Sequence, residues 1–446
     1  MSVTASPCVS VGVCGNRLSC LDRCTTAHSP LPISLNNVVG LTEEARQMIR
    51  ELEQYREVAP KGTIDFLYRL SDLVRDKRFL HISSVRYGGG MAEILRRIVP
   101  IMKTMGIEAS WEVIAGTQEF NDVTRRITDG LQGREETITE EMYQIYLDVN
   151  ARNAKALNLD ADLIFVHDPQ PAALVDHRKG GTWVWRCHLD AGQPYRPVWS
   201  LFRRHVLKYD AAVFSLPGFA QRLPIPKFLL YPSIDPLTEK NRELSRGEIL
   251  QVLDRFGIAR GKPILLQVGR FDRFKDQIGT IRAYRMAQKH HPCQLVLAGS
   301  GVLHDAEGEA VLAEVQQAAG NDPDIHVLQL PPEADREINA LQRGATIVVQ
   351  RALKEGFGVA VSESMWKGKP VIGGTTGGVS AQIVDGATGF IVHSVEGAAF
   401  RIRYLLSNPG VMTRMGALGK EHVRRNFLTT RHLGDYLTMV KLLCPE

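Results

Sequence analysis

The sequence predicts an α/β protein built from two tandem Rossmann-like domains, each a doubly wound parallel sheet, that face each other across a cleft. Three observations support this fold class. Short apolar runs alternate with helix-like stretches along most of the chain, as in parallel sheets whose crossovers are helices. The pattern starts again after a proline-bounded segment at 232–236. The length of 446 residues also suits two domains of roughly two hundred residues each.

Residues 1–34 are rich in Ser, Thr, Gly and Val, and we expect them to form a disordered leader. A metal or redox element is the alternative, because the leader holds four of the seven cysteines, Cys8, Cys14, Cys20 and Cys24. Their spacing differs from the close pairs of common zinc sites. The other three, Cys187, Cys293 and Cys444, are isolated, which is typical of reduced thiols in a reducing compartment.

Residues 35–232 are predicted to form the first domain. A helix is expected over 42–70, and a strand at 79–84 leads through Gly88, Gly89 and Gly90 into a helix over 91–105. This order of strand, glycine turn and helix is the start of a parallel α/β unit. Further strands are expected at 111–114, 163–167, 182–186, 211–215 and 228–231.

Residues 233–426 are predicted to form the second domain, with strands at 264–268, 294–298, 325–329, 346–349 and 370–373. Ligands bind beyond the carboxyl ends of the strands in open parallel sheets, so two such domains would enclose one cleft. Functional residues are therefore expected directly after strands.

The composition excludes several classes of protein. With 44% hydrophobic and 23% charged residues, the chain resembles an ordinary soluble protein. Lys and Arg number 54 against 49 Asp and Glu, and the net charge of +5 is too small for a typical nucleic-acid-binding protein. The sequence has no apolar run of eighteen residues and no secretory signal. We predict a cytoplasmic protein and expect no nucleic-acid or membrane partner.

Charged residues follow two strands of the second domain. Glu355 lies in a strand-to-helix loop beside two glycines, and Glu363 falls eight positions later in the next helix. Carboxylates accept strong hydrogen bonds from sugar hydroxyls and ribose diols. Arg270 and Lys275 follow the strand at 264–268, where their charges can converge on a diphosphate and stabilise a departing phosphate oxygen. Solvated loop and helix surfaces are the alternative for both clusters.

The glycine turns are candidate anion sites. The N–H groups at 88–90 stand at a helix start, where anions bind readily, and Gly377 and Gly378 could act in the same way in the second domain. Tight turns without a ligand are the alternative. The sequence has neither the spaced-glycine dinucleotide fingerprint nor a phosphate-loop Gly-Lys-Ser/Thr, which disfavours dehydrogenases and kinases.

Polar residues also follow two strands of the first domain. Asp168 could accept a hydrogen bond from an incoming hydroxyl, and His188 could lie beside the reacting carbon, with Asp190 close by in the sequence. A buried, hydrogen-bonded histidine is the alternative. The Asp-x-Asp pairs at 160–162 and 322–324 precede strands, so we interpret them as turns and predict no metal site. Serine-hydrolase and zinc-protease signatures are absent.

Together these motifs resemble the retaining glycosyltransferases of the two-Rossmann-domain GT-B superfamily, whose second domain carries two Glu residues separated by seven positions. Within it, the sequence is most similar to the family 4 trehalose synthases, which transfer glucose from a nucleotide sugar to glucose. The narrowest signals are His-Asp-Pro-Gln-Pro at 167–171 and Trp-Arg-Cys-His at 185–188. Roughly residues 35–440 are covered, through stretches at 88–93, 166–171, 183–190, 233–238, 267–276, 339–342, 355–370 and 426–431.

The resemblance implies a role for each candidate residue. Glu355 would contact the donor hexose and Glu363 the nucleotide ribose, while Arg270 and Lys275 would neutralise the departing diphosphate. The glycine turn at 88–90 would approach the donor phosphates, and His188 would lie near the anomeric carbon.

Further assignments implied by the resemblance concern the base, the acceptor and the C-terminus. Backbone near Leu330 would recognise the base, with uridine, adenosine and guanosine donors all open. Asp168 and Asp190 would bind the acceptor glucose. The C-terminal helix at 427–446 would return to the first domain.

The implied reaction moves a glucosyl group from nucleoside diphosphate glucose to glucose, with retained configuration, and forms trehalose. A trehalose phosphorylase of the same fold is one alternative. A transferase with a lipid-carrier acceptor is another, favoured by the basic, aromatic stretch at 195–208. A catalytically silent sugar-nucleotide sensor is a third. No tightly bound cofactor is expected, and stimulation by a divalent metal and homo-oligomerisation stay open.

Overall fold

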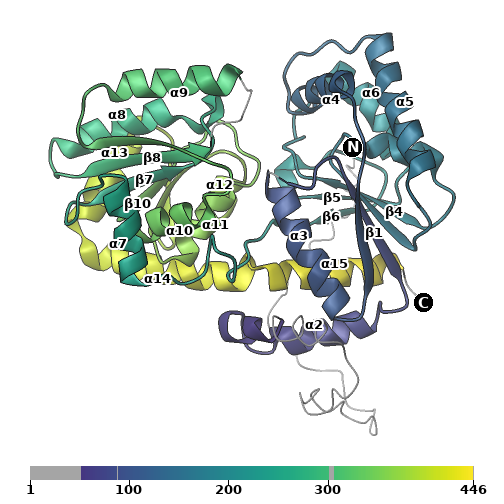
Figure 1. Cartoon of the computed structure of the whole chain (residues 1–446), viewed down its shortest axis with the longest axis horizontal. Coiled ribbons are helices and arrows are strands. Elements are labelled where there is room, and N and C mark those ends of the chain that lie inside the picture. The colour runs from purple at the N-terminus through teal and green to yellow at the C-terminus, as the bar shows by residue number, and fades with distance from the viewer. Residues whose placement is uncertain (1–51, 88, 301–305, 445–446) are drawn as a thin grey trace, which may run out of the picture.

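The computed structural model describes residues 52–87, 89–300 and 306–444. It contains two six-stranded parallel sheets, one in each half of the chain. Figure 1 shows the two sheets side by side, with long helices running along the base of both halves. The leader expected at 1–34 lies outside the described residues.

The first sheet has the strand order β2-β1-β3-β4-β5-β6. Its central strands β3 and β4 are buried along almost their whole length, as expected for parallel strands covered on both faces. The register pairs Val166 of β3 with Ile82 of β1 and with Trp185 of β4. The six strands are β1 (Arg78–Ser83), β2 (Glu108–Val113), β3 (Leu163–His167), β4 (Thr182–Cys187), β5 (Ala211–Phe214) and β6 (Lys227–Leu229).

The second sheet has the order β12-β11-β10-β7-β8-β9. Every strand expected from the sequence is present, with bounds within three residues of the expected ones. The edge strand β12 is the one strand of the described structure that was not predicted from the sequence. The strands are β7 (Ile264–Val268), β8 (Gln294–Ser300), β9 (Ile325–Leu330), β10 (Ile347–Gln350), β11 (Val371–Gly374) and β12 (Gly389–Val392).

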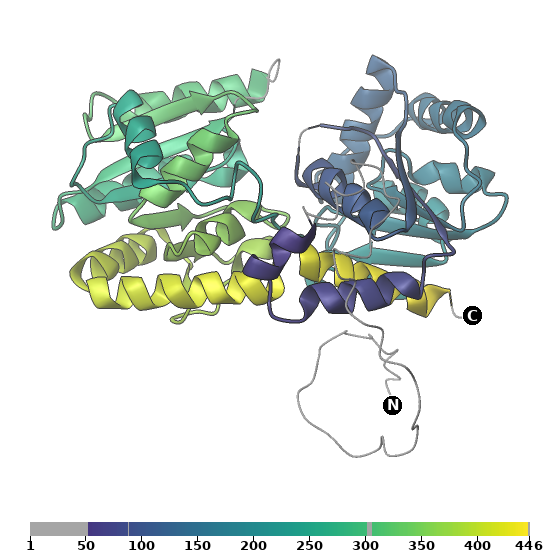
Figure 2. The same cartoon turned by 60° about the horizontal axis from the view of Figure 1, so that its bottom comes forward.

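Helices cover both sheets (Figures 1 and 2). Those of the first half are α2 (Thr63–Asp72), α3 (Gly89–Thr104), α4 (Gln118–Leu131), α5 (Glu140–Ala156) and α6 (Arg196–Val206). Those that follow are α7 (Arg246–Arg255), α8 (Gln277–Gln288), α9 (Ala306–Ala319), α10 (Asp335–Gly344), α11 (Val359–Trp366), α12 (Gly377–Ala381), α13 (Val395–Ser407), α14 (Pro409–Asn426) and α15 (Thr429–Leu443). Within the described ranges, no helix is both long and apolar enough to cross a membrane.

The single helix expected over 42–70 is wrong in its described part. Residues 52–58 are helical, but the helix ends before Pro60, and α2 begins only at Thr63. Pro60 has no backbone N–H to donate, and Gly62 adopts a left-handed conformation with φ of 83°. These two residues break the helix, although the apolar periodicity continues across them.

The chain crosses between the two halves twice, and the crossings lie side by side. Ile234 donates its N–H to the Phe427 carbonyl (2.8 Å) and accepts from the Thr429 N–H (3.0 Å). Beyond this point α15 packs against α2 and α3 of the first half. Figure 2 shows α14 and α15 running in succession beneath both sheets. The two crossings therefore connect the halves on the side of the molecule where α14 and α15 run.

Candidate functional site

The connection between α4 and α5 of the first half contacts loops at the carboxyl end of the second sheet. The ammonium group of Lys354, after β10, donates to the backbone carbonyl of Gln132 in the first half. The guanidinium of Arg134 lies 5.0 Å from the ring centre of Phe274, which follows β7. The two halves are therefore in direct contact beside the loops after β7 and β10, where functional residues of the second half were expected.

Lys275 and Glu355 form an ion pair in the second half. Lys275 closes a short 3-10 turn after β7, and Glu355 lies in the loop after β10, so neighbouring strands bring them together. Their side chains are 18% and 17% exposed. Gln267 donates to the Lys275 carbonyl (2.6 Å) and fixes this turn to β7. Arg270 lies in the same loop, but its side chain is 62% exposed and its partner is Asp272 at 3.5 Å.

Gly377 and Gly378 support the loop that carries Glu355. Gly378 donates its N–H to the Gly356 carbonyl (2.7 Å), so this N–H is used by the protein and is not offered to an anion. A Cβ at Gly377, whose φ is 53°, would collide with the Glu355 carbonyl oxygen. The two glycines thus permit a close approach between α12 and the Glu355 loop, a role that the sequence analysis did not consider.

Glu363 lies on α11 and is 2% exposed. Its Oε1 is 3.2 Å from the ammonium of Lys240, and its Oε2 accepts from Gln342 (3.2 Å). Burial alone would raise the pKa of Glu363, but the cations Lys240 and Lys367 lower it below its ordinary value. Burial in turn lowers the pKa of Lys367 to about 7. Glu363 is therefore a buried carboxylate that is held ionised.

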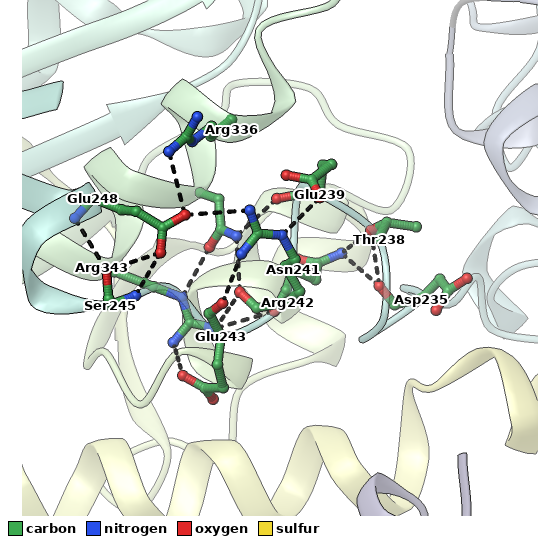
Figure 3. A network of polar contacts seen from close by, with 11 residues as sticks. Asp235, Thr238, Glu239, Asn241, Arg242, Glu243, Ser245, Glu248, Arg336 and Arg343 are labelled. Carbon is green, nitrogen blue, oxygen red and sulfur yellow. Dashed lines mark hydrogen bonds and ion pairs between the residues drawn. The ribbon is translucent and has the colours of Figure 1, made fainter. Parts of the chain in front are cut away.

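Lys240, which was not predicted as a site residue, links the two halves. Its ammonium lies 3.3 Å from Glu93 on α3, as well as close to Glu363. Figure 3 shows how polar contacts anchor its chain segment to α10: Arg343 donates to the carbonyls of Asn241 (3.1 Å) and Arg242 (2.8 Å). Lys240 directly follows the quoted stretch at 233–238, but only the tertiary structure reveals its two acidic partners.

A pocket of about 440 Å³ lies between α3 and the second half. Its wall includes Gly90, Glu93, Lys240 and Glu363. Gly89 has a φ of 79°, and a Cβ at Gly89 or Gly90 would meet no heavy atom within 4 Å. The described part of the glycine turn therefore borders open space, as an anion site requires. Gly88 lies outside the described residues.

In the first half, the loops after β3 and β4 are tied together. The carboxylate Oδ1 of Asp168 accepts the backbone N–H of His188 (2.8 Å), and His188 Nε2 lies 3.1 Å from Nδ1 of His167. Asp168 has a φ of 65°, a strained conformation for a residue with a side chain. Burial raises the pKa of Asp168 to about 6. Asp168 and His188, both partly buried, thus belong to one hydrogen-bonded arrangement.

A second pocket of about 680 Å³ lies beside this arrangement, between the two halves. Asp190, Gln132 and Gln193 line it from the first half, and Lys354 and Gly377 from the second. Asp190 also accepts the Gly192 N–H (3.1 Å).

Two other expectations concern the base and metals. Leu330 ends β9 and is only 6% exposed, so its side chain packs in the core. In the part of the chain that the structure describes, no group of three or more His, Cys, Asp or Glu side chains is arranged to hold a metal ion.

Two sequence-family profiles match the chain. The profile described as "Trehalose synthase, N-terminal domain" matches residues 81–221, and "Glycosyl transferases group 1" matches residues 252–422. The trehalose synthase of Pyrococcus horikoshii is 43% identical over 401 residues, which covers 88% of this chain and 97% of the relative. That of Rubrobacter xylanophilus is 39% identical over 406 residues, with the same coverage of both chains.

Solved structures with the same fold have much lower identity. An α,α-trehalose-phosphate synthase (UDP-forming) from Burkholderia vietnamiensis aligns with a TM-score of 0.66 at 15% identity, covering 82% of this chain and 98% of that one. Sucrose-phosphate synthase from Thermosynechococcus elongatus aligns with a TM-score of 0.63 at 18% identity, again over 82% and 98%. The GT-B fold expected from the motifs is confirmed. The chain is a glycosyltransferase that belongs to the trehalose synthase family.

Proposed function

We propose that this enzyme transfers a glucosyl group from nucleoside diphosphate glucose to glucose, with retained α configuration, and so forms trehalose. The observation that carries the proposal is the pocket between the two halves, whose wall includes Gly90 of the glycine turn together with Lys240 and Glu363 of the second half. The Lys275–Glu355 ion pair, in the loops after β7 and β10, supports it. The names and coverage of the trehalose synthase relatives support it.

The donor would bind along the second half of the cleft. Lys275 and Arg270 would meet the diphosphate, together with the N–H groups of Gly89 and Gly90. Cations placed where negative charge develops stabilise the transition state, and one such contact contributes on the order of 3–4 kcal/mol. The UDP-forming synthase with the same fold supports a nucleoside diphosphate as the leaving group.

Two carboxylates would orient the sugars of the donor. Glu355 would accept hydrogen bonds from the hexose hydroxyls, and Glu363 from the ribose diol. The backbone near Leu330 would contact the base. The ionised state of Glu363 supports its role, because a charged acceptor forms the stronger hydrogen bonds.

The reaction would proceed on one face of the donor sugar. The bond between the anomeric carbon and the diphosphate oxygen breaks, the acceptor oxygen bonds to that carbon, and the acceptor proton passes to the departing diphosphate. A retaining enzyme with a covalent intermediate needs a carboxylate nucleophile. Glu355 is paired with Lys275, and Asp168 accepts the His188 N–H, which favours the front-face route. Trapping a covalent glucosyl-enzyme would contradict it.

The acceptor would occupy the pocket lined by Asp190 and Gln132. Among the described residues of its wall, Lys354 supplies a positive charge and Asp190 a negative one. Lys354 is already engaged with the Gln132 carbonyl, so a phosphate group would meet the Asp190 carboxylate without a free cation. This arrangement favours unphosphorylated glucose, which Asp168 and Asp190 would bind through its hydroxyls.

Trehalose phosphorylase is the second candidate, because a fungal enzyme of that name from Pleurotus pulmonarius is also related. It is only 24% identical, and the match covers 59% of its length. The lower identity and partial coverage favour the synthase.

The deciding experiment incubates the purified full-length protein with glucose and with UDP-, ADP- or GDP-glucose. We expect α,α-trehalose and one nucleoside diphosphate per transfer, measured by NMR and chromatography. A matched reaction with glucose 1-phosphate and glucose should give no trehalose. Product from glucose 1-phosphate alone would support the phosphorylase, and no product from any donor would contradict the proposal.

A further inference from the structure

Three histidines of the first half form a line of ring contacts that starts at His188 and leads away from the cleft. His188 Nε2 lies 3.1 Å from Nδ1 of His167, and His167 Nε2 lies 3.2 Å from Nδ1 of His81. His81 lies on β1, His167 ends β3, and His188 directly follows β4. Because β1, β3 and β4 are neighbours in the sheet, the line crosses three strands through side chains alone.

The three rings are neutral around pH 7. Burial lowers the pKa of His81 to about 3, and it also holds the pKa values of His167 and His188 well below the ordinary value. His81 and His167 are 0% and 2% exposed, whereas His188 is only partly buried. The line therefore runs from the buried core to a partly buried residue, His188, whose carbonyl lies close to Gly356 of the second half.

The proton positions of neutral imidazoles in such a line depend on one another. Each ring has one N–H and one bare nitrogen, and each contact needs one donor and one acceptor. Both contacts join a Nδ1 to a Nε2, so the protons must all be on Nδ1 or all on Nε2. The state of His81 consequently determines which nitrogen of His188 carries a proton.

The closed end of the line favours protons on Nδ1. Nε2 of His81 is buried and has no hydrogen-bond partner among the described residues. A buried N–H without a partner is rarer than a bare acceptor. The ring of Tyr436 lies 5.7 Å from the His81 ring, and its buried hydroxyl has no hydrogen-bond partner among the described residues. A hydroxyl can donate, so this neighbour suits a bare nitrogen on His81 better than another N–H.

We propose that His81 and His167 are positioning residues that hold His188 in its Nδ1–H form, so that this N–H donates to an oxygen of the bound sugar nucleotide. Within the described residues, the hydrogen bonds of His188 use its Nε2 and its backbone N–H, which leaves Nδ1 for a ligand. Asp168 accepts the backbone N–H of His188, so the backbone and the Nε2 side of the ring are both held. The identity of the oxygen rests on the proposed function, but the tautomer does not.

Nitrogen-15 NMR of the full-length protein, labelled on histidine side chains, tests the tautomer directly. A His188→Gln variant assigns the His188 signals. We expect a protonated Nδ1 and a bare Nε2 at His188 in the absence of any ligand. A bare Nδ1 would overturn the inference. If the expected tautomer is found but no sugar transfer occurs, the proposed function fails and the tautomer assignment stands.

Two amide variants of His167 test its positioning role. The His167→Asn side chain places its amide near the position of Nδ1, so it can still donate to His188, whereas His167→Gln reaches toward His81. We expect His167→Asn to keep the His188 signals and a kcat within about threefold of the parent. His167→Gln should disturb those signals and lower kcat about tenfold, with little change in the donor KM.

His205→Asn is the matched control. His205 is a buried histidine of the same half, bonded to Tyr143 and Asp176 away from the cleft. This variant should leave the His188 signals and kcat unchanged. Equal effects of His205→Asn and His167→Gln, or equal activity of the two His167 variants with unchanged His188 signals, would contradict the inference.

Discussion

The two walls of the cleft have the same architecture but differ in how their buried polar groups are paired. Each is the carboxyl edge of a six-stranded parallel sheet. The second half presents ion pairs there, Lys275 with Glu355 and Lys240 with Glu363. The first half presents neutral imidazoles joined to one another, with a carboxylate bound to a backbone N–H. One wall is suited to a charged ligand, and the other to orienting uncharged hydroxyls.

This difference follows from the physical cost of burying charge. A buried ion needs a partner to offset its lost hydration, and the pairs of the second half supply one before any ligand arrives. Neutral imidazoles avoid that cost, but they must remain unprotonated. Removal of a charged side chain from the second wall should therefore lower activity most, and acid pH should destabilise the first wall most.

The largest effect is expected from Lys275→Met, which removes the cation proposed to meet the leaving diphosphate. It should lower kcat by roughly 10²–10³-fold, since one such contact contributes about 3–4 kcal/mol to the barrier. Steady-state kinetics with nucleoside diphosphate glucose measures it. Arg273→Met is the control, because Arg273 lies in the same turn but pairs with Glu314 on α9. A loss below tenfold for Lys275→Met would show that the second wall does not act through its charge.

Acid should destabilise the wall of neutral histidines. His432, on α15, is a further buried histidine, near enough to His167 for a charge on one to affect the other. Burial holds its pKa well below that of an unfolded histidine, near 6.5. The unfolded chain takes up a proton below this pH and the folded chain does not, so stability is lost as the pH falls. Replacing His432 by Phe removes one such proton and should reduce the loss by about 1.4 kcal/mol per pH unit.

Urea unfolding between pH 5 and 7.5 measures this change. At pH 5 the difference between parent and His432→Phe should reach about 2 kcal/mol relative to pH 7. The exposed His177 provides the control, and His177→Phe should leave the pH dependence as it is. An unchanged slope for His432→Phe would mean that the buried imidazole is not a source of acid sensitivity.

A smaller effect is expected where the walls are joined. Lys240→Met removes the partner of both Glu363 and Glu93, and it should weaken binding of a nucleoside diphosphate by roughly tenfold, or about 1.4 kcal/mol. Glu93→Gln breaks only the link to α3 and keeps Glu363 paired, so it should have a weaker effect. Calorimetric titration separates the two, and equal effects would place the role of Lys240 in joining the halves rather than in supporting Glu363.

The smallest effect concerns the glycine turn. Gly89 has a φ of 79°, so Gly89→Ala should lower stability by about 1 kcal/mol through backbone strain. Gly90 does not have a positive φ, and Gly90→Ala should leave stability nearly unchanged while its methyl group weakens nucleotide binding. Thermal unfolding and calorimetry together test this pair. Equal nucleotide affinity for Gly90→Ala and the parent would remove the turn from the donor site.

Much of the fold follows from local patterns in the sequence. Strands such as β3 and β7 are continuous apolar runs between turn residues, so their bounds were predicted without error. The prediction of one helix over 42–70 was wrong at Pro60, because the apolar periodicity continues across a residue that breaks helices.

The site was only partly predictable, because its remaining members depend on tertiary contacts. Glu355 and Lys275 could be singled out because each follows a strand. Lys240 could not, since its partners Glu93 and Glu363 lie 147 and 123 positions away in the sequence. The contacts of the histidine line could not be predicted from the sequence either. Within its strand, His81 has no pattern that distinguishes it from the other buried residues.

The most direct test of the two-wall account is a crystal structure of the protein with nucleoside diphosphate glucose bound. The account predicts that the diphosphate lies within hydrogen-bond distance of the Lys275 ammonium and of a backbone N–H of Gly89 or Gly90 at the same time, with the ribose at Glu363. A diphosphate held by one half alone, with the other wall turned away from it, would contradict the account.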